Sequence, residues 1–471
     1  MNEQNITKIQ IVYCKIWIDE NMSLKETIKK IHEKTITIEV FGLGYVGFPL
    51  AVRLASSGLN VIGIDTNQER IERLKKNKLM DSEIHLEENY SKCREEKNIR
   101  LQLTPFASSN SKIGIICVPT PIPSKEISSD TFVRSAVESF LTCAKIGDMI
   151  VLESSIEVGT TEKIKEIIEN KGFKVGKDFG LCFCPERIDP ANKEWGIENI
   201  PRVIYCSDES SFDIAKEIYQ NVNKGNLLKV DSPKIAEIVK SFENAFRLVN
   251  ISLVNELAIL CDKLGVNVKE IIDAAATKPF GFLVHYPGAG AGGHCIPKDP
   301  RFLLESAKKL ELQFDTIEYA LKINKFMPKY IANSIEKLLE HSRLEKIALV
   351  CGLSYKANVE DMRDSPSFKI IQELNAKGFT VYGFDPFFNS DLTEKYLIEN
   401  HISELNFQIL SDLSDKSIKQ INCLCIVQHH DEIKNRINEI YEKSLIPCIY
   451  DCQSKLSKNI QSKSKLKFLG N

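Results

Sequence analysis

Short apolar runs that end in glycine or an acidic residue recur along the chain, and stretches of helical periodicity separate them. The run at 35–42, TITIEVFG, is rich in β-branched residues and ends in glycine. The stretch that follows, YVGFPLAVRLASSG, has apolar residues at spacings of three and four and stops at Gly58. Strand-type runs that alternate with helical stretches are typical of α/β proteins with parallel sheets. The pattern therefore predicts an α/β fold.

Further runs extend the first predicted sheet, and a long helix follows them. Strands of this sheet are expected at NVIGID, KIGIICVP, DMIVLESS and FGLCFCPE. From about Asp231 the pattern changes, and residues 232–265 keep helical periodicity for more than thirty residues with no proline after Pro233. A helix of this length either spans two domains or packs against a partner subunit.

The opening pattern returns near residue 345. EKIALVCG predicts a strand that ends in glycine, SPSFKIIQELNAKG a capped helix, and FTVYGFD a strand that ends in Asp385. We therefore predict two doubly wound lobes joined by a helical middle. The expected boundaries are an N-terminal extension at 1–34, a first lobe at 35–230, a helical domain at 231–330 and a second lobe at 331–471. The extension is expected to hold a strand and a short helix, and the tail after about Ser454 is expected to fray.

Composition and charge exclude several classes of protein. A chain of 471 residues suggests two or three domains. The net charge of −2, with acids and bases mixed along the chain, gives no electrostatic footprint for nucleic acid or an anionic membrane. The apolar runs have the length of strands, and charged residues interrupt the N-terminus, so no secretory signal is expected. We expect a cytoplasmic protein that binds neither nucleic acid nor a membrane.

The 14 cysteines are scattered without a CxxC pair. Two CxC pairs, Cys182/Cys184 and Cys423/Cys425, fall inside apolar strand-like runs, where alternation points both thiols of a pair to one face. Small buried hydrophobes in a reducing compartment are expected here, rather than disulfides or a metal site. The pair His429 and His430 follows a strand and is expected in a solvent-exposed loop.

GLGYVG at 42–47 is a GxGxxG motif between a predicted strand and a predicted helix, and Asp65 ends the next strand. This context indicates a Rossmann-like dinucleotide site. Gly42 permits the tight turn, Gly44 lets the pyrophosphate approach the backbone, and Gly47 allows close packing of helix and strand. The phosphates would then lie on the N-terminal amides of the helix. The alternative is a glycine turn that only packs.

Asp65 and Arg70 define the ribose and adenine end of this predicted site. The Asp65 carboxylate would accept hydrogen bonds from the adenosine ribose and repel a 2′-phosphate, so NAD is predicted rather than NADP. Arg70 lies one helical turn further on, where it could stack near the adenine. The cofactor supplies a hydride acceptor, and the substrate must be inferred from other residues.

Eight motifs follow one another from about Thr35 to about Gln453: GLGYVGFPLA, CVPTP, ESSIEVGTT, CPERI, KSFENAF, NELA, GAGAGGHCIPKDP and GLSYKANVEDMRDSP. In this order they resemble the UDP-glucose/GDP-mannose dehydrogenase family, enzymes that oxidise nucleotide sugars. The resemblance implies two Rossmann-like lobes, NAD as cofactor and a UDP-sugar as substrate. It adds five positions to the cofactor site, namely Tyr45, Val46, Pro119, Thr120 and Arg363.

The resemblance also implies that Cys295, in the glycine-rich stretch 288–300, is a nucleophile. The glycines would leave room for the sugar C6 and the nicotinamide to approach the thiol. Conversion of a primary alcohol into a carboxylate removes four electrons as two hydrides. The intermediate aldehyde must gain a nucleophile before the second hydride can leave. A thiolate supplies it, giving a thiohemiacetal and then a thioester that water hydrolyses.

The supporting groups are carried over one at a time. Asp299 resembles the carboxylate that positions water and moves protons. Lys240 matches the lysine that stabilises the developing alkoxide, and Asn244, four residues on, can donate to the same oxyanion. Glu186 matches the glutamate assigned to thioester hydrolysis. Ser155 stands where the family usually has a threonine, and its hydroxyl could hold a water.

Structural alternatives to these roles remain open. Asp299 could cap a helix that begins near Pro300. Glu186 and Arg187 could form a surface ion pair. The polar residues of KSFENAF could be no more than the exposed face of a helix.

The second lobe resembles the family's UDP-binding domain. Its implied contacts, together with those of the loop before Cys295 and of CPERI, are Arg187, Tyr286, Gly288, Gly292, Tyr355 and Lys356. In the family the long helix forms a dimer interface, so we expect a homodimer or a higher homo-oligomer.

CPERI and KPFGFLVHYPGAGAGGHCIP look more like the branch that acts on UDP-N-acetylglucosamine or UDP-N-acetylmannosamine. Lys298 and Glu157 depart from that branch, so UDP-glucose remains an alternative substrate. Two other functions are weighed against this one. A two-electron hydroxyacid dehydrogenase gives no reason for the second lobe or for Cys295, and a non-catalytic sensor of NAD and sugar nucleotides gives no reason for the set of reactive residues.

Overall fold

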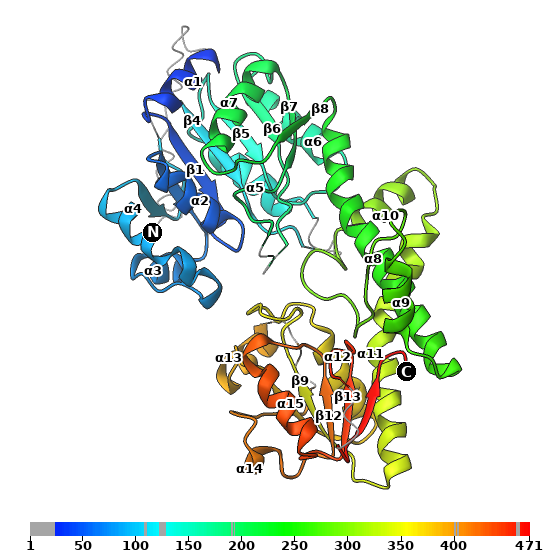
Figure 1. Ribbon diagram of the computed structural model, residues 1–471. Helices are drawn as coiled ribbons and strands as arrows, with labels where there is room; N and C mark the ends of the chain where they lie inside the picture. Colours follow the sequence, from blue (N-terminus) through cyan, green and yellow to red (C-terminus); the bar gives the residue numbers. More distant parts are fainter. Residues whose placement is uncertain are drawn as a thin grey trace, which may run out of the picture. The chain divides into compact units, whose positions relative to one another are not determined.

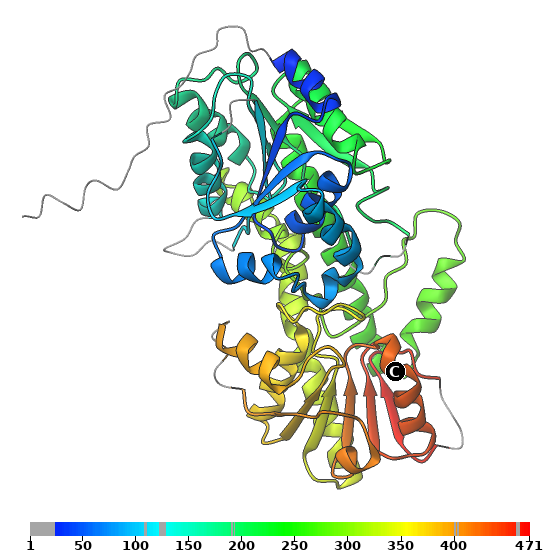
Figure 2. The same cartoon turned by 90° about the vertical axis from the view of Figure 1, so that its left-hand side faces the viewer.

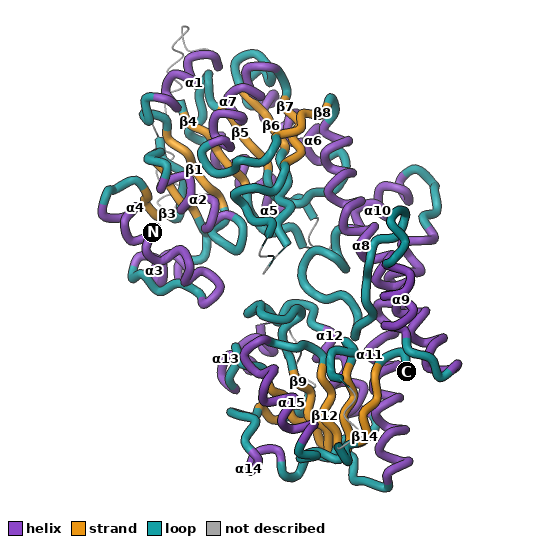
Figure 3. The backbone as a smooth tube through the Cα atoms, in the orientation of Figure 1, coloured by secondary structure: helices purple, strands orange, loops and turns teal. Residues whose placement is uncertain are grey.

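The structure is a computed structural model that describes residues 24–107, 111–121, 129–189, 192, 194–399, 402, 405–457 and 462–471. The chain divides into two compact units, one up to Lys240 and one from Ser241 onward (Figure 1). Each unit is built around one parallel or mostly parallel sheet, and helices and strands alternate along the chain (Figure 3). The predicted α/β class and the two doubly wound lobes are therefore confirmed.

The first unit holds an eight-stranded sheet. Its strands lie in the order β3 (Ile99–Gln102), β2 (Asn60–Ile64), β1 (Thr37–Phe41), β4 (Lys112–Ile116), β5 (Met149–Leu152), β6 (Gly180–Phe183), β7 (Arg202–Cys206) and β8 (Leu227–Val230). Neighbouring strands are parallel, apart from the antiparallel pair β6 and β7. The order 3-2-1-4-5-6 within it is that of the Rossmann fold, whose ligands bind where the strand order reverses, here beyond β1 and β4.

Helices cover both faces of this sheet. One face packs against α1 (Leu24–His32), α2 (Gly47–Ser56), α4 (Glu87–Glu95) and α7 (Glu209–Gln220). The other face packs against α5 (Thr131–Leu141) and α6 (Thr160–Asn170). Because both faces are covered, strands such as β5 and β6 are buried along their whole length, which explains their continuous apolar sequences. Between β2 and α4 the chain forms α3 (Gln68–Lys75) and a short 3₁₀ helix at Asp81–Leu86.

Helix α1 belongs to the predicted N-terminal extension and packs on the first unit. Leu24 and Ile31 are each 3% exposed and join the core beside α7. The Thr27 hydroxyl donates to the carbonyl of Gly147 at 3.2 Å. The predicted helix of the extension is therefore confirmed, and its predicted strand lies outside the described residues.

The second unit holds a six-stranded sheet in the order β11 (Gln408–Ile409), β10 (Thr380–Phe384), β9 (Ile347–Cys351), β12 (Cys423–Ile426), β13 (Cys448–Asp451) and β14 (Lys465–Phe468). Its neighbouring strands are parallel, as the aligned arrows of Figure 2 show. One face packs against α9 (Val268–Ala276), α11 (Asp315–Ser342) and α12 (Pro366–Ala376), and the other against α14 (Asp415–Ile418) and α15 (Lys434–Glu442). This unit also contains α10 (Pro300–Lys309), α13 (Ser390–Glu399) and a 3₁₀ turn at Asp431–Ile433. This sheet repeats the order 3-2-1-4-5-6.

Helix α8 (Pro233–Leu264) is the long helix that the sequence predicts, with 32 residues. Its C-terminal half packs through Val254, Ala258 and Cys261 into the core of the second unit. In the described part of the chain, α8 is the single helix long and apolar enough to cross a membrane by length and composition. One such helix is weak support for a membrane span, because core helices of water-soluble proteins meet the same criterion.

Both sheets close the turn after their first strand in the same way. In each lobe a glycine with positive φ ends the strand. The next residue, Leu43 or Leu353, donates its N–H to the carboxylate at the end of the neighbouring strand. That acceptor is Asp65 at 2.8 Å in the first unit and Asp385 at 2.7 Å in the second. The strand, glycine and aspartate that recur in the sequence therefore form the same backbone-to-carboxylate hydrogen bond in both lobes.

The expectation that His429 and His430 lie in a solvent-exposed loop is wrong. His429 and His430 are 8% and 0% exposed rather than solvent-exposed. His429 pairs with Asp451 at 2.9 Å, and His430 accepts the N–H of Asn358 at 3.0 Å through Nδ1. Asn358 and Asp385, in the segments after β9 and β10, contact His430, and Asp451, at the end of β13, contacts His429, so both rings are enclosed at this edge of the sheet.

The tail after Ser454 is not frayed where the structure describes it. Residues 465–468 form strand β14 and pair with β13, and Leu469 is fully buried. The carbonyl of Gly470 accepts the N–H of Val268 at 3.0 Å. A lysine- and serine-rich composition indicated solvent exposure, but alternate apolar residues in KLKFL supply an edge strand. Residues 458–461 lie outside the described part.

Candidate functional site

The glycines of GLGYVG are explained by contacts around the turn between β1 and α2. Gly42 has φ +87°, and a Cβ there would lie 2.8 Å from the carbonyl oxygen of Cys117. A Cβ on Gly47 would lie 1.9 Å from the Gly42 carbonyl oxygen, so helix and strand can pack this closely only with glycine. Gly44 has no atom within 4 Å of its Cβ position and leaves its backbone open. This is the arrangement that the predicted cofactor site requires.

The Asp65 carboxylate is fixed at the carboxyl end of β2. Its Oδ2 accepts the N–H of Leu43 at 2.8 Å, and its Oδ1 accepts the N–H of Asn67 at 2.9 Å. Arg70 donates through Nε to the Leu43 carbonyl at 3.0 Å, pairs with Glu83 and lies 5.1 Å from the Phe48 ring centroid. The guanidinium is thus held beside the glycine turn, and its stacking on adenine remains a prediction.

The other predicted cofactor positions lie at the carboxyl ends of β1 and β4. Tyr45 is 38% exposed, and Val46 is half-buried at the start of α2. Pro119 is exposed and Thr120 is 3% exposed in the segment after β4. These residues flank the point at which the strand order reverses, where ligands bind in open α/β sheets.

Glu186 lies after β6 in the first unit and is 8% exposed. Its Oε1 accepts the N–H groups of Arg187 at 2.6 Å and of Ile188 at 2.7 Å. Its Oε2 accepts from Nη2 of Arg202 at 2.5 Å. The alternative of a surface ion pair between Glu186 and Arg187 is wrong, because this carboxylate is buried against Arg202. Ser155, half-buried, follows β5 in the same unit.

Arg202 is a functional candidate that the sequence reasoning missed. It begins β7 in PRVIYC and is 2% exposed. Besides Glu186 it bonds to Glu153 at 2.9 Å. The two acidic partners lie 49 and 16 residues away along the chain, so no local pattern in one sequence marks this arginine.

Cys295 lies in a tight turn of the second unit and is exposed, whereas the other cysteines in the described part of the chain are buried or half-buried. Its carbonyl accepts the N–H groups of Lys298 at 3.2 Å and of Asp299 at 2.8 Å. The paired cysteines of the strands are fully buried, as predicted, and burial raises the pKa of the Cys184 thiol to about 12. A thiol needs access and thiolate character to react, so Cys295 is the candidate nucleophile among them.

Asp299 and Asn244 are brought together by α10 and α8. Asp299 is fully buried, and its Oδ2 accepts from Nδ2 of Asn244 at 2.7 Å. Asp299 stands at the N-cap position, directly before α10, but its side chain makes no capping hydrogen bond, so the capping alternative is wrong for the carboxylate. Lys240, one helical turn before Asn244 on α8, is 9% exposed, which contradicts a fully solvated helix face.

Cationic groups surround the cysteine turn. The Nζ of Lys298 lies 3.5 Å from Oδ1 of Asp299. Burial, with the charges of Lys298 and Arg363, lowers the pKa of His294 to about 3, so this imidazole is neutral at neutral pH. Burial lowers the Arg363 pKa, but the hydrogen bond to Asp361 and the charges of Asp361, Cys295 and Tyr355 raise it overall. A guanidinium within electrostatic reach of Cys295 stabilises negative charge on the sulfur.

The glycines before Cys295 make room for the protein itself as well as for a ligand. A Cβ on Gly292 would lie 2.7 Å from the Asp364 carbonyl oxygen, and one on Gly293 would lie 2.7 Å from the Tyr355 ring. The prediction that all these glycines leave room for substrate is therefore incomplete. Gly288 and Gly292 are the two glycines predicted to contact the substrate. Of these two, Gly288 has no atom within 4 Å of its Cβ position.

Two asparagines hold this loop, and the sequence reasoning gave neither a role. Asn255, in NELA, accepts the N–H of Gly288 at 2.9 Å. Asn324 accepts the N–H of Ala291 at 2.6 Å and donates to its carbonyl at 2.9 Å. Such paired bonds fix the backbone that leads to Cys295. The NELA motif could have indicated Asn255, whereas nothing local indicates Asn324.

The remaining predicted substrate residues lie in different parts of both units. Arg187 donates to the Pro201 carbonyl at 2.8 Å. Tyr355 and Lys356 are half-buried in the loop after β9. Tyr286 is 47% exposed, and its hydroxyl donates to Asp273 of α9 at 2.7 Å. This hydrogen bond does not involve the turn that carries Cys295. The sugar contact of Tyr286 remains a prediction.

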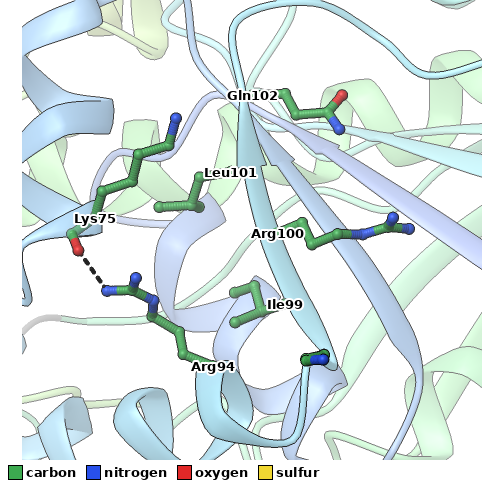
Figure 4. A pocket seen from close by; sticks show the side chains of 7 residues that line it. Lys75, Arg94, Ile99, Arg100, Leu101 and Gln102 are labelled. Carbon is green, nitrogen blue, oxygen red and sulfur yellow. Dashed lines mark hydrogen bonds between the residues drawn. The ribbon is translucent and has the colours of Figure 1, made fainter.

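Two of the hollows on the described surface lie in different units. One, of about 400 Å³, is lined within the second unit by His294, Arg363 and residues of α12 and α13. The other lies on the first unit between α3, α4 and edge strand β3, where Arg94 donates to the Lys75 carbonyl at 2.6 Å (Figure 4). Its lining residues are Lys75, Arg94, Lys97, Ile99, Arg100, Leu101 and Gln102. None of the predicted site residues lines this second hollow. The described residues include no cluster of three or more His, Cys, Asp or Glu suited to a metal.

Models of known protein families match segments of both units. Residues 36–223 match the NAD-binding domain of the UDP-glucose/GDP-mannose dehydrogenase family, residues 234–326 its central domain, and residues 349–458 its UDP-binding domain.

Relatives and solved structures agree with these matches. The UDP-N-acetyl-D-mannosamine dehydrogenase of Methanococcus maripaludis is 35% identical, over 92% of this chain and 96% of that protein. The UDP-N-acetyl-D-glucosamine 6-dehydrogenase of Pseudomonas aeruginosa is 31% identical, over 76% and 84%. The structure of the UDP-D-ManNAc dehydrogenase of Pyrococcus horikoshii is similar with a TM-score of 0.79 at 28% identity, over 92% and 99%. The chain therefore belongs to the UDP-glucose/GDP-mannose dehydrogenase family and is an NAD-dependent nucleotide-sugar dehydrogenase.

Proposed function

We propose that this chain is a UDP-N-acetylhexosamine 6-dehydrogenase. It oxidises the C6 hydroxyl of UDP-N-acetylglucosamine or UDP-N-acetylmannosamine to the carboxylate with two NAD⁺, and supplies uronic acids for polysaccharide or glycan synthesis. The observation that carries the proposal is Cys295, exposed in a tight turn whose Asp299 bonds to Asn244. A two-electron dehydrogenase would have no use for this thiol.

Each reactive residue has a role in the proposed sequence. Lys240 and Asn244 donate to the oxygen on which negative charge develops, and Asp299 accepts the hydroxyl proton of the substrate, directly or through water. The Cys295 thiolate then adds to the aldehyde carbon and forms the thiohemiacetal. After the second oxidation, Glu186 assists attack of water on the thioester. Water oxygen joins the carbonyl carbon, the C–S bond breaks, and the sulfur leaves with the electron pair.

The first unit fits NAD, which supplies the hydride acceptor when it is bound. Gly44 leaves the backbone of the turn open for a pyrophosphate, and the fixed Asp65 carboxylate suits a ribose with a free 2′-hydroxyl. Tyr45, Val46, Pro119 and Thr120 flank the same position. Ser155 remains a proposed water-holding residue, and Arg363 a proposed cofactor contact from the second unit.

The choice of an N-acetylated sugar is supported by the relatives that are about a third identical, which are named for UDP-N-acetylmannosamine and UDP-N-acetylglucosamine. Arg187, Tyr286, Gly288, Gly292, Tyr355 and Lys356 are proposed as contacts of the sugar nucleotide. UDP-glucose is the alternative substrate, because Lys298 and Glu157 depart from the pattern of the N-acetylated branch.

A panel of UDP-sugars tests this proposal. The purified chain is mixed with NAD⁺ and UDP-N-acetylglucosamine, UDP-N-acetylmannosamine or UDP-glucose, NADH is followed by absorbance, and products are identified by mass spectrometry. We expect two NADH per uronate and a kcat/KM at least about tenfold higher for one N-acetylated sugar than for UDP-glucose. A ratio of one NADH with release of an aldehyde contradicts the four-electron reaction. Binding of NAD and UDP-sugar by calorimetry with no NADH favours the sensor instead.

We also propose that α8 mediates a homodimer. Large apolar side chains lie on one face of this helix in the second unit and are solvent-exposed in the single chain: Phe242 54%, Phe246 46%, Leu253 61%, Leu260 53% and Leu264 65%. Their spacing by 4, 7, 7 and 4 keeps them within one narrow stripe. An exposed stripe of this kind marks an interaction surface.

Light scattering after size exclusion measures the expected dimer. Wild-type chain should have about twice the mass of 53.3 kDa, and Leu260→Glu should shift it to the monomer, because a buried interface does not tolerate an unpaired carboxylate. Glu340→Gln, at an exposed position of α11 outside this stripe, is the control that should leave the dimer intact. A monomeric wild-type chain at micromolar concentration contradicts the proposal.

A further inference from the structure

Arg202 is the largest fully buried side chain in the described part of the protein. A guanidinium always carries its charge, and its burial is unfavourable unless carboxylates and hydrogen bonds surround it. We propose that Arg202 is a positioning residue for Glu186: it fixes the carboxylate oxygen that accepts the proton of the attacking water in thioester hydrolysis. This inference rests on the proposed function, in which Glu186 serves that step.

The guanidinium divides its donors between two acidic residues of neighbouring strand ends. Nη1 donates to Oε1 of Glu153 at 2.9 Å, and Nη2 donates to Oε2 of Glu186 at 2.5 Å. The ring of Tyr219 lies 4.7 Å from the guanidinium carbon, and the Tyr219 hydroxyl donates to Glu153 at 2.5 Å. Glu153 is thereby anchored, and Arg202 cannot move without breaking a buried pair.

The two carboxylates differ in access. The Glu153 side chain is 0% exposed, and burial raises its pKa although the adjacent Arg202 lowers it. The Glu186 side chain is 10% exposed and therefore reaches the edge of the cluster. Glu153 thus acts as the counter-charge that keeps Arg202 in place, while Glu186 is the carboxylate that a water can approach.

The hydrogen bonds also indicate which oxygen of Glu186 can act as a base. A carboxylate has about four acceptor positions, two on each oxygen. The N–H groups of Arg187 and Ile188 occupy both positions on Oε1. Oε2 accepts one bond, from Arg202, and keeps a position for the proton of water. Arg202 therefore orients the oxygen that performs the proposed proton transfer.

The test separates the two halves of the reaction. Replacement of Arg202 by methionine together with Glu153→Gln removes both members of the buried pair and avoids an isolated buried carboxylate. We expect this double variant to form about two NADH per site in a burst and then stall with the sugar acyl group bound to Cys295. The steady-state kcat should fall by about 100-fold, since misplacement of a reacting group by about 1 Å has that effect.

Further measurements distinguish positioning from a loss of stability. Hydroxylamine should cleave the accumulated thioester without a general base and restore NADH formation in the double variant. The pair Lys112 and Glu39, 3.3 Å apart and fully buried in the same sheet, supplies the matched control. Lys112→Met with Glu39→Gln should lower the melting temperature but accumulate no acyl-enzyme. Arg202→Lys keeps the positive charge but loses the planar fork of donors. It should accumulate less acyl-enzyme than the double variant, and it takes the place of the double variant in the test if that variant does not fold.

A parallel Glu186→Gln variant makes the outcomes distinct. Acyl-enzyme in both Glu186→Gln and the Arg202 double variant supports the inference. Acyl-enzyme in Glu186→Gln alone overturns the inference and leaves the proposed function intact. Acyl-enzyme in neither, with uronate still formed, overturns the proposed role of Glu186 and the inference with it.

Discussion

Replacement of Cys295 by alanine should lower the rate of uronate formation by on the order of 10⁴-fold or more, the scale on which removal of a nucleophile acts. Without the thiol, an aldehyde formed by the first oxidation has no covalent partner from which the second hydride can leave. NADH and uronate are both measured, since the variant retains the residues proposed for the first oxidation. The expected residual product is aldehyde or its hydrate.

Cys143→Ala is the control for this experiment. Cys143 is half-buried in the first unit and has no proposed role, so its variant should turn over like the wild type. Circular dichroism should give the same folded spectrum for both variants, because an exposed side chain at position 295 contributes little to the core. Uronate formation by Cys295→Ala at a wild-type rate would contradict the covalent mechanism.

Asp299→Asn is expected to have the second largest effect. The carboxylate is fully buried, and its Oδ2 is bonded to Asn244, so an amide of the same shape fits the site but cannot accept a proton. We expect kcat to fall by about 10²–10⁴-fold, the usual contribution of a general base, with the KM for the UDP-sugar changed by no more than about threefold. Steady-state kinetics with saturating NAD⁺ measures both values.

Loss of the carboxylate also removes a partner of Lys298, which lies 3.5 Å away. Asp262→Asn controls for that loss, because Asp262 pairs with Lys467 in the same unit and has no proposed catalytic role. Both variants should lose stability, whereas only Asp299→Asn should lose kcat. An equal fall of kcat in the two variants would show that Asp299 acts through stability alone.

Recognisable patterns in the sequence predicted the helices, the strands and the turns whose geometry depends on a few residues. The glycine after β1 and the aspartate after β2 stand in the GxGxxG and acidic-residue pattern of the Rossmann fold, so the turn and its carboxylate could be recognised although their contact joins two strands. The same reasoning predicted the capped helix α12, whose Ser365 accepts the N–H of Ser367. Long periodic segments such as α8 were predictable because their apolar spacing persists over many turns.

Partners that are distant in the sequence were not predictable in this way. Arg202 finds its two carboxylates only when β5, β6 and β7 assemble. His430 is buried because the loop that holds Asn358 closes over it. Gly292 and Gly293 pack closely against Asp364 and Tyr355 in the loop after β9, which is distant in the sequence, so an explanation of these glycines by a ligand alone was incomplete.

The central claim is that the sulfur of Cys295 bonds to the oxidised sugar carbon during turnover. Acid quenching of the wild-type enzyme within the first turnovers, followed by proteolysis and peptide mass spectrometry, tests it directly. The account predicts the mass of the UDP-uronyl group on the peptide that contains Cys295, and its loss after treatment with hydroxylamine. Uronate production with no adduct on that peptide at any time point would contradict the account.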